Sequence, residues 1–324
     1  MVKKITAGKK IVIAIGGNSL IKNGRQSASF QEQLETVRET TANIALIVKQ
    51  GYRVVITHGN GPQVGDVLIR SYLTRNLLPD IPLDMANAIT QSEIGYMIQQ
   101  SLKNELLKQN LNYYDVVTVV TQVVVDKNDP AFTDYTKPVG PFYSKKEAFA
   151  LQSERSWVMK EDAGRGFRRL VSSPQPKEIV EINEIRSLLD SGAIVIAAGG
   201  GGIPVFRNDH KALVPTSAVI DKDLTSALLA DLINADILLI STSIERAYIN
   251  FNKPDQKPLC QITAKQAKDY YDQGHFGQGS MRPKVYAGIK FISSKNNRQV
   301  IITDPKNLNT SLSNKKMGTR IMKL

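Results

Sequence analysis

Three lysines in this sequence stand beside turns or at predicted helix starts, where they could face a negatively charged ligand. They are Lys137, Lys222 and Lys284. Transfer of a phosphoryl group needs little covalent help from a protein. It needs donor and acceptor held in line, and the moving charge neutralised by lysines and backbone N–H groups. Isolated lysines in such places therefore indicate phosphate chemistry rather than a Ser-His-Asp site.

Lys222 lies between two carboxylates, Asp221 and Asp223. Asp223 could hold one or more lysines in position. Alternatively, Asp221 or Asp223 only caps the helix and Lys222 points to solvent, and the sequence leaves both possibilities open. Lys284 follows a Gly-Ser pair and Pro283, a pattern typical of a helix start that can bind an anion. Taken alone, Lys284 is better interpreted as a surface lysine.

Glycine-rich turns follow three short apolar runs, which are residues 11–15, 54–56 and 194–198. The turns are residues 16–18, 57–62 and 199–202. A glycine turn at the end of a strand lets backbone N–H groups approach an anion closely, and a helix that starts there adds its positive end. The turns together predict an enzyme that handles phosphate. A standard P-loop and the signature motifs of protein kinases are both absent from the sequence.

The three histidines, His58, His210 and His275, have no spacing typical of a metal site. His58 could serve as a general base because its unperturbed pKa lies near neutrality. At the end of a strand, a hydrogen-bonded structural histidine is the better interpretation. We therefore expect no protein-held metal.

Composition indicates an ordinary globular protein. The chain has 324 residues, 42% of them hydrophobic and 22% charged. Its formal net charge of +12 is scattered, without the basic runs typical of nucleic-acid binding. No apolar stretch approaches the ~20 residues of a membrane span, and the run after residue 10 is too short for a signal peptide. Cys260 is the only cysteine, so we expect a cytoplasmic protein without disulfides.

Strand and helix patterns alternate along the chain and predict an α/β fold, a three-layer αβα sandwich around a mostly parallel sheet. We expect strands at residues 11–15, 54–56, 113–125 (interrupted at 121–122), 194–198, 237–240, 248–251 and 300–303, and a hairpin at 205–214. We expect helices beginning near residue 34 and at Pro62, and at 85–108, 178–191, 224–233, 263–273 and 284–292.

Residues 126–173 are polar and rich in proline, and we interpret them as a projecting lid inserted in the N-terminal lobe. We expect this lid to have a small core of its own, built from Phe132, Tyr135, Phe142, Tyr143, Phe149 and Trp157. The predicted lobes are residues 1–203 and 204–324.

Six motifs, taken together and in order, resemble the carbamate kinases of the amino acid kinase family. They lie at residues 16–18, 57–65, 137–143, 199–205, 218–224 and 274–284, and span nearly the whole chain. The resemblance implies reversible phosphoryl transfer between ATP and carbamate with Mg²⁺, in arginine or carbamoyl phosphate catabolism. It also implies a homodimer, with the N-terminal lobe binding carbamate or carbamoyl phosphate and the C-terminal lobe binding nucleotide.

The resemblance also assigns roles to individual residues. Lys137, Lys222, Asp223 and Lys284 would be catalytic, with Lys137 closing over the substrate from the lid and Lys284 holding the nucleotide phosphates. The transferred groups would be cradled by Gly16, Gly17, Asn18, Gly59, Asn60 and Gly61. The nucleotide would be bound by Asp221, Thr242, Tyr248, Met281 and Lys284.

One segment departs from the family pattern. Where the family has Leu-Thr-x-Val-Asp, this chain reads Ser-Thr-Ser-Ile-Glu at residues 241–245. The resemblance places this segment at the nucleotide pocket, so nucleotide preference is open. Two alternatives remain: a kinase of the same fold acting on another small carboxylate or phosphonate, and a non-catalytic nucleotide-binding regulator.

Overall fold

An eight-stranded sheet runs through the middle of the computed structural model, which describes residues 8–17, 28–162, 164, 166–277 and 281–323. The strand order is β15-β17-β16-β12-β1-β2-β9-β3. The strands are β1 (Lys10–Ile15), β2 (Arg53–His58), β3 (Val116–Thr118), β9 (Ile194–Ile196), β12 (Ile237–Ser241), β15 (Gln261–Thr263), β16 (Gln299–Thr303) and β17 (Thr319–Met322). Only β16 and β17 pair in antiparallel fashion, so the expected mostly parallel sheet is confirmed.

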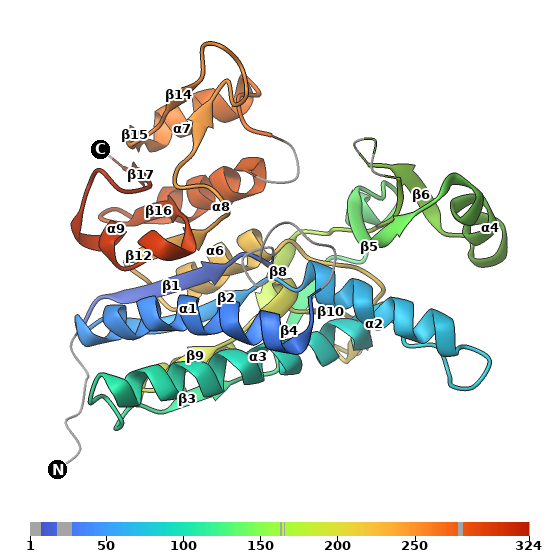
Figure 1. Ribbon diagram of the computed structural model, residues 1–324, viewed down its shortest axis with the longest axis horizontal. Coiled ribbons are helices and arrows are strands. Elements are labelled where there is room, and N and C mark those ends of the chain that lie inside the picture. Colours follow the sequence, from blue (N-terminus) through green and yellow to red (C-terminus); the bar gives the residue numbers. More distant parts are fainter. Residues whose placement is uncertain (1–7, 18–27, 163, 165, 278–280, 324) are drawn as a thin grey trace.

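Helices cover both faces of this sheet (Figure 1). The helices of the described residues are α1 (Phe30–Lys49), α2 (Gly61–Thr74), α3 (Leu83–Lys108), α4 (Lys145–Arg155), α5 (Ile182–Asp190), α6 (Lys222–Leu232), α7 (Ala264–Asp272), α8 (Met281–Ser294) and α9 (Thr310–Ser313), and of these α4 lies in a projecting part away from the sheet. The buried residues form two main clusters, one on each side. Alternate residues of β1 divide between them: Ile11 and Ile13 pack with α1 and α3, whereas Val12 and Ala14 pack with α5, α6 and α8. This period of two is what a sheet buried on both faces requires.

Smaller sheets flank the main one. β11 (Leu213–Pro215), β10 (Ile203–Arg207), β4 (Gln122–Val125) and β8 (Pro176–Ile179) form one, and β13 (Tyr248–Ile249) pairs with β14 (Lys257–Pro258). Short 3₁₀ turns span Pro130–Phe132, Gly199–Gly201 and Pro305–Asn307. The predicted hairpin corresponds to β10 and β11. Because β10 pairs with β4, a division of the chain at residue 203 stays a prediction.

The expected strand at residues 113–125 is two strands that belong to different sheets, β3 and β4. The chain bends at Thr121, whose backbone is held by the side chain of Gln91: Thr121 N–H donates to Gln91 Oε1 at 2.9 Å, and Gln91 Nε2 donates to Thr121 O at 3.1 Å. A buried amide from a distant helix therefore decides where the chain leaves the main sheet.

The expected helix at residues 178–191 is partly wrong. Residues 176–179 form β8 and pair antiparallel with β4, and the helix begins only at Ile182. Glu181, next to the helix start, accepts hydrogen bonds from the backbone and side chain of Gln122, at 2.8 and 2.9 Å. Strands β14, β15 and β17 were not expected from the sequence.

The lid projects from one end of the molecule and contains β5 (Lys137–Tyr143), α4, β6 (Val158–Glu161) and β7 (Phe167–Val171) (Figure 1). Its small core consists of Ala148, Leu151 and Met159, with Tyr72 of α2 and the partly buried Tyr143, Trp157 and Phe167 around them. The aromatic core expected from the sequence is thus only partly correct, because Phe149 and Tyr135 are exposed and Phe132 packs against the main core. The described residues include no helix long and apolar enough to cross a membrane.

Candidate active site

A cleft of about 240 Å³ opens where β1, β2 and β12 end and α6 and α8 begin. In a parallel sheet the carboxyl ends of the strands and the amino ends of the following helices meet at one edge, which is where ligands bind. The lining residues come from the glycine turns, from β5, and from the ends of the strands and helices around the cleft: Gly16, Gly17, Gly59, Asn60, Gly61, Pro62, Lys137, Gly200, Val219, Ile220, Asp221, Lys222, Asp223, Ser241, Thr242, Ser243, Pro283 and Lys284.

The glycine turns meet one another at one side of the cleft. A Cβ added to Gly59 would lie 2.6 Å from Gly17 N, and one added to Gly200 would collide with the side chain of Asn60. Gly200 also has a φ of +65°, a conformation that L side chains rarely adopt. Glycine is therefore required at Gly59 because another backbone approaches closely, and at Gly200 because of its φ and the packed asparagine side chains; backbone-lined turns of this kind suit an anion.

The side chain of Asn60 is buried and hydrogen-bonded to residues of α3. Its Nδ2 donates to Asn87 Oδ1 and, at 2.8 Å, to Thr90 Oγ1, both on α3. Asn87 Nδ2 in turn donates to Gly202 O at 2.5 Å. Asn87 of α3 thus joins two of the glycine turns, one through Asn60 and the other through Gly202.

Asp223 holds two lysines together at the base of the cleft. Its Oδ1 accepts from Lys222 Nζ at 2.6 Å and its Oδ2 from Lys284 Nζ at 3.0 Å. The three side chains are 5 to 13% exposed. Of the two possibilities left open by the sequence, the structure has Lys222 turned inward and not toward solvent. The helix is capped by Asp221, whose Oδ1 accepts from Asp223 N at 2.9 Å.

The electrostatics of this cluster favour a bound anion. Burial alone would raise the pKa of Asp223, but the two lysines outweigh burial and hold that pKa below its usual value. Burial lowers the pKa of Lys222, and Lys284 adds to the shift. For Lys284, burial alone would lower the pKa, but the charge of Asp223 and the hydrogen bond to it raise the pKa above its usual value. With one carboxylate for two ammonium groups, the cluster carries a net charge of about +1 that a phosphate could compensate.

Lys137 is the first residue of β5, and its side chain lines the cleft. Its Nζ donates to Asp221 Oδ2 at 2.7 Å, and its side chain is 34% exposed. The lid lysine and the catalytic candidates of α6 therefore share one edge of the cleft.

His58 is buried, and its Nδ1 lies 3.2 Å from Gly59 O. The pKa of His58 is lowered to about 4, mainly by burial. The hydrogen bond to Gly59 raises the pKa, and the charge of nearby Lys222 lowers it further. A Cβ on Gly199 would collide with the imidazole, so His58 packs under the third glycine turn. This geometry agrees with a structural histidine.

The predicted nucleotide residues separate into two groups. Asp221, Thr242 and Lys284 line the cleft, whereas Tyr248 and Met281 do not, and Met281 is buried in the main core. Asn18 lies outside the described residues. The roles assigned from the resemblance stay predictions.

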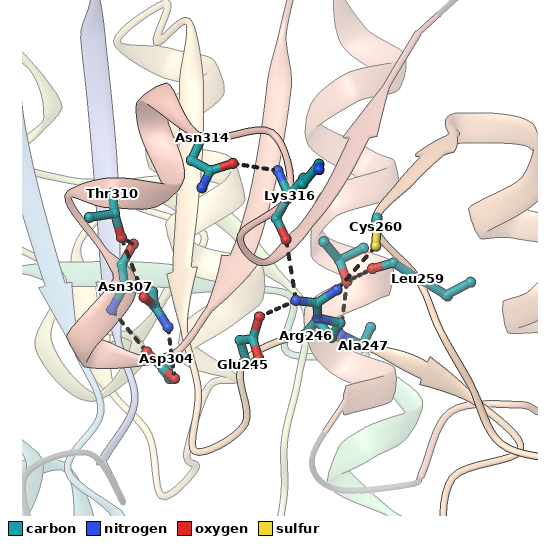
Figure 2. Close-up of polar contacts among 11 residues, drawn as sticks. Glu245, Arg246, Ala247, Leu259, Cys260, Asp304, Asn307, Thr310, Asn314 and Lys316 are labelled. Carbon is teal, nitrogen blue, oxygen red and sulfur yellow. Dashed lines mark hydrogen bonds and ion pairs between the residues drawn. The ribbon is translucent and has the colours of Figure 1, made fainter.

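The segment that departs from the family pattern is anchored by Arg246 (Figure 2). Its guanidinium contacts Glu245, donates to Lys316 O at 3.2 Å, and lies 3.1 Å from Cys260 Sγ. Next to it, Ala247 N donates to Thr319 Oγ1 at 2.8 Å. The loop that begins in the cleft at Thr242 is therefore tied to the C-terminal part of the chain.

Several lining residues were not selected from the sequence. Gly200 belongs to the predicted glycine turn at residues 199–202. The run of four glycines in this turn is the signal that could have identified Gly200 as a lining residue. Ser241, Ser243, Val219 and Ile220 were not assigned roles one by one, although they lie in the segment 218–224, which carries the resemblance, and in the segment 241–245, which departs from the family pattern; they reach the cleft at the end of β12 and just before α6.

The carboxylates at the cleft do not form a metal cage. Asp223 is engaged by two lysines and Asp221 by one lysine and a helix N–H. Among the described residues no group of three His, Cys, Asp or Glu side chains could hold a metal ion. The residues present do not fit a protein-held Mg²⁺, which prefers several free oxygen ligands.

Known carbamate kinases are similar to this chain over nearly its whole length. The carbamate kinase of Pyrococcus horikoshii is 48% identical over 295 residues, which are 90% of this chain and 93% of that protein. The carbamate kinase-like protein YahI of Escherichia coli is 46% identical, with 97% and 98% covered. The structure of carbamate kinase from Giardia lamblia bound to AMP-PNP superposes with a TM-score of 0.91 at 41% identity, covering 98% of this chain and all of that one.

These similarities confirm the resemblance to carbamate kinases and the expectation of an ATP-dependent kinase. The family model for the amino acid kinase family matches residues 9–304. The chain is a member of the amino acid kinase family.

Proposed function

We propose that this protein is a carbamate kinase, which transfers a phosphoryl group reversibly between ATP and carbamate. The observation that carries the proposal is the buried Lys222–Asp223–Lys284 cluster facing two glycine turns across one cleft. The carbamate kinase relatives support the choice of substrate.

In the ATP-forming direction, a terminal phosphate oxygen of ADP attacks the phosphorus of carbamoyl phosphate. The bond from phosphorus to the carbamate oxygen breaks, and carbamate leaves with that electron pair. Both ends of the transfer are anionic, so catalysis depends on alignment and charge neutralisation. Lys222 would neutralise the transferred phosphoryl group, Lys284 the nucleotide phosphates, and Lys137 the carbamoyl phosphate.

The glycine turns supply the remaining donors. Backbone N–H groups of Gly17 and Gly61 would bind phosphoryl oxygens without the reorganisation that flexible side chains require, whereas the N–H of Gly59 donates to Ile15 O at 2.9 Å and holds the second turn against β1. Asp223 would act on neither substrate and would hold the two lysines at their separation. Ser241 at the end of β12, and Thr242 and Ser243 in the loop after it, would face the nucleotide.

Mg²⁺ is proposed to enter as part of the nucleotide substrate, held by its phosphates and by water. The lysine-bound carboxylates of the cleft support this assignment rather than a resident metal. A place in arginine or carbamoyl phosphate catabolism and a cytoplasmic location complete the proposal, the latter supported by the single cysteine.

We further propose a homodimer formed through β3 and α3. β3 is an edge strand of the main sheet, and exposed strand edges attract partners. Beside it lie the exposed Ile89, Tyr96 and Val120, and a hollow of about 500 Å³ between α3 and β3. A second copy could cover this surface through a two-fold axis. Sedimentation analysis of wild type and Tyr96→Glu tests it, because the variant should be monomeric.

The main alternative is a kinase for another small carboxylate, which the carbamate kinase-like relative of E. coli keeps open. The test is ATP formation from ADP with a panel of acyl phosphates. The proposal predicts that carbamoyl phosphate has the highest kcat/KM, and a preference for acetyl phosphate would contradict it. If the protein binds nucleotide but turns over none of these acyl phosphates, the result would favour a non-catalytic nucleotide-binding regulator.

A further inference from the structure

The lid is attached through a neck made of residues 137–139 and 169–172. Lys137 pairs with Val171, and Val139 with Arg169, in antiparallel fashion. Val139 and Val171 are buried and pack with Val64 and Val67 of α2 and with Val219. The neck is therefore part of the packed body of the protein, although the lid above it projects into solvent.

The neck docks on the segment that leads into α6. Val219 N donates to Ser172 O at 3.0 Å, and Lys137 Nζ donates to Asp221 Oδ2 at 2.7 Å. The other oxygen of Asp221 accepts from Asp223 N. One carboxylate thus binds both the lysine of the neck and the start of the helix that carries Lys222.

Regular pairing of the neck stops at Gly140. This residue has a φ of +75°, and the register between β5 and β7 shifts between Val139 and Tyr143. Lys137 lies on the body side of this irregularity and α4 lies beyond it, whereas β6 pairs with the neck itself, Val158 with Leu170 and Met159 with Arg169. The packing of Val139 and Val171 against the body holds Lys137 in place.

We propose that Asp221 is a positioning residue that holds Lys137 over the cleft, and that Lys137 is a fixed part of the substrate site. An ammonium group has three N–H donors, and the contact with Asp221 uses one of them. The other N–H groups can face a phosphate or carbamoyl oxygen. This role differs from the nucleotide contact that the resemblance assigns to Asp221, and the substrate it serves rests on the proposed function.

The first experiment compares Asp221→Asn with wild type, because asparagine caps a helix about as well as aspartate but carries no charge. We expect the KM for carbamoyl phosphate to rise about tenfold, while the Kd for ADP, measured by calorimetry, stays within about twofold. Asp221→Asn combined with Lys137→Gln should behave like Lys137→Gln alone. The matched control is Asp80→Asn, which breaks the ion pair between Asp80 of the body and Arg155 at the end of the lid helix α4 and should change neither constant.

Hydrogen exchange of the ligand-free protein provides a test that does not depend on turnover. In Asp221→Asn, exchange should accelerate about tenfold in residues 137–139 and 171–172, and Asp80→Asn should leave those residues unchanged. If the wild type binds ADP but forms no ATP, the proposed function fails and the exchange result still decides the role of Asp221.

Two results would overturn the inference. A loss of ADP affinity in Asp221→Asn as large as the rise in KM would make Asp221 a nucleotide contact. Unchanged kinetics and exchange in Asp221→Asn, with destabilisation only in Asp221→Ala, would reduce Asp221 to a helix cap.

Discussion

Replacing Asp223 by asparagine should affect both stability and turnover, and the structure gives the size of the first effect. The substitution removes the single carboxylate between Lys222 and Lys284, whose side chains are 11% and 13% exposed. The cluster changes from a net charge of about +1 to about +2. Breaking a buried ion pair from one side costs roughly 3–5 kcal/mol. For a chain of 324 residues that corresponds to a fall in Tm of roughly 4–7 °C.

An anionic ligand should offset part of this loss, because phosphates replace the missing negative charge. ADP at about 100 times its Kd adds about 2.7 kcal/mol to the stability of any form that binds it. Because the variant has one more uncompensated positive charge, we expect it to bind ADP more tightly than wild type does, so that the same ADP concentration stabilises it more and the Tm difference between the two proteins shrinks. The kcat should stay at least about 10²-fold below wild type, since the lysines lose their alignment.

The dependence on pH has a defined sign. The folded pKa of Asp223 is lowered from its usual 3.8, so its contribution to stability is present above that value and is lost as pH falls through the lower folded pKa. The Tm difference between Asp223→Asn and wild type should be full at pH 7 and shrink below about pH 4.

The assay is thermal unfolding with and without ADP, combined with turnover. Asp231→Asn is the matched control, because it breaks the ion pair with the buried Arg298 far from the cleft. It should lower Tm without lowering kcat. The reasoning would be refuted by an Asp223→Asn protein with the Tm and kcat of wild type.

Further predictions concern the glycine turns, His58 and the nucleotide loop. Gly59→Ala should reduce kcat roughly 10²-fold because its Cβ would push Gly17 away, whereas Gly61→Ala, which meets nothing within 4 Å, should change kcat less than threefold; steady-state kinetics decide this. The pKa of His58 is lowered to about 4 in the folded protein, so as the pH falls the unfolded chain binds a proton at this residue first. The free energy of unfolding of wild type should therefore decrease between pH 6.5 and 4, by up to about 3 kcal/mol. In urea titrations, His58→Gln should lack this part of the pH dependence. Arg246→Ala should raise the KM for ADP roughly fivefold with little change in kcat, because the loop that starts at Thr242 loses its anchor; equal kinetics would show that the loop needs no such support.

Local patterns were sufficient to predict the strands and helices that carry the cleft. The apolar runs before the glycine turns are fully buried strands, and Pro62 lies in the first turn of α2, where its missing N–H costs nothing. The order of these elements implied a parallel sheet, and with it a common edge for Lys222 and the turns. Recognition of the motifs then supplied what spacing alone left open.

Other features depend on contacts between distant segments, which no local pattern records. The break at Thr121 is set by Gln91, thirty residues away, and β8 exists because β4 pairs with it. The pairing of Lys137 with Asp221 joins positions 84 residues apart. Charge and turn propensity could suggest each residue separately, but only the fold brings the two together.

The central claim is that this cleft transfers a phosphoryl group between carbamoyl phosphate and ADP through Lys222. The most direct measurement is ATP formation from these substrates with Mg²⁺, for wild type and for Lys222→Ala with its fold verified by circular dichroism. We predict robust synthesis by wild type and a loss of at least about 10³-fold in the variant. Synthesis by the variant at a rate near wild type, or none by a folded wild type that binds ADP, would contradict the claim.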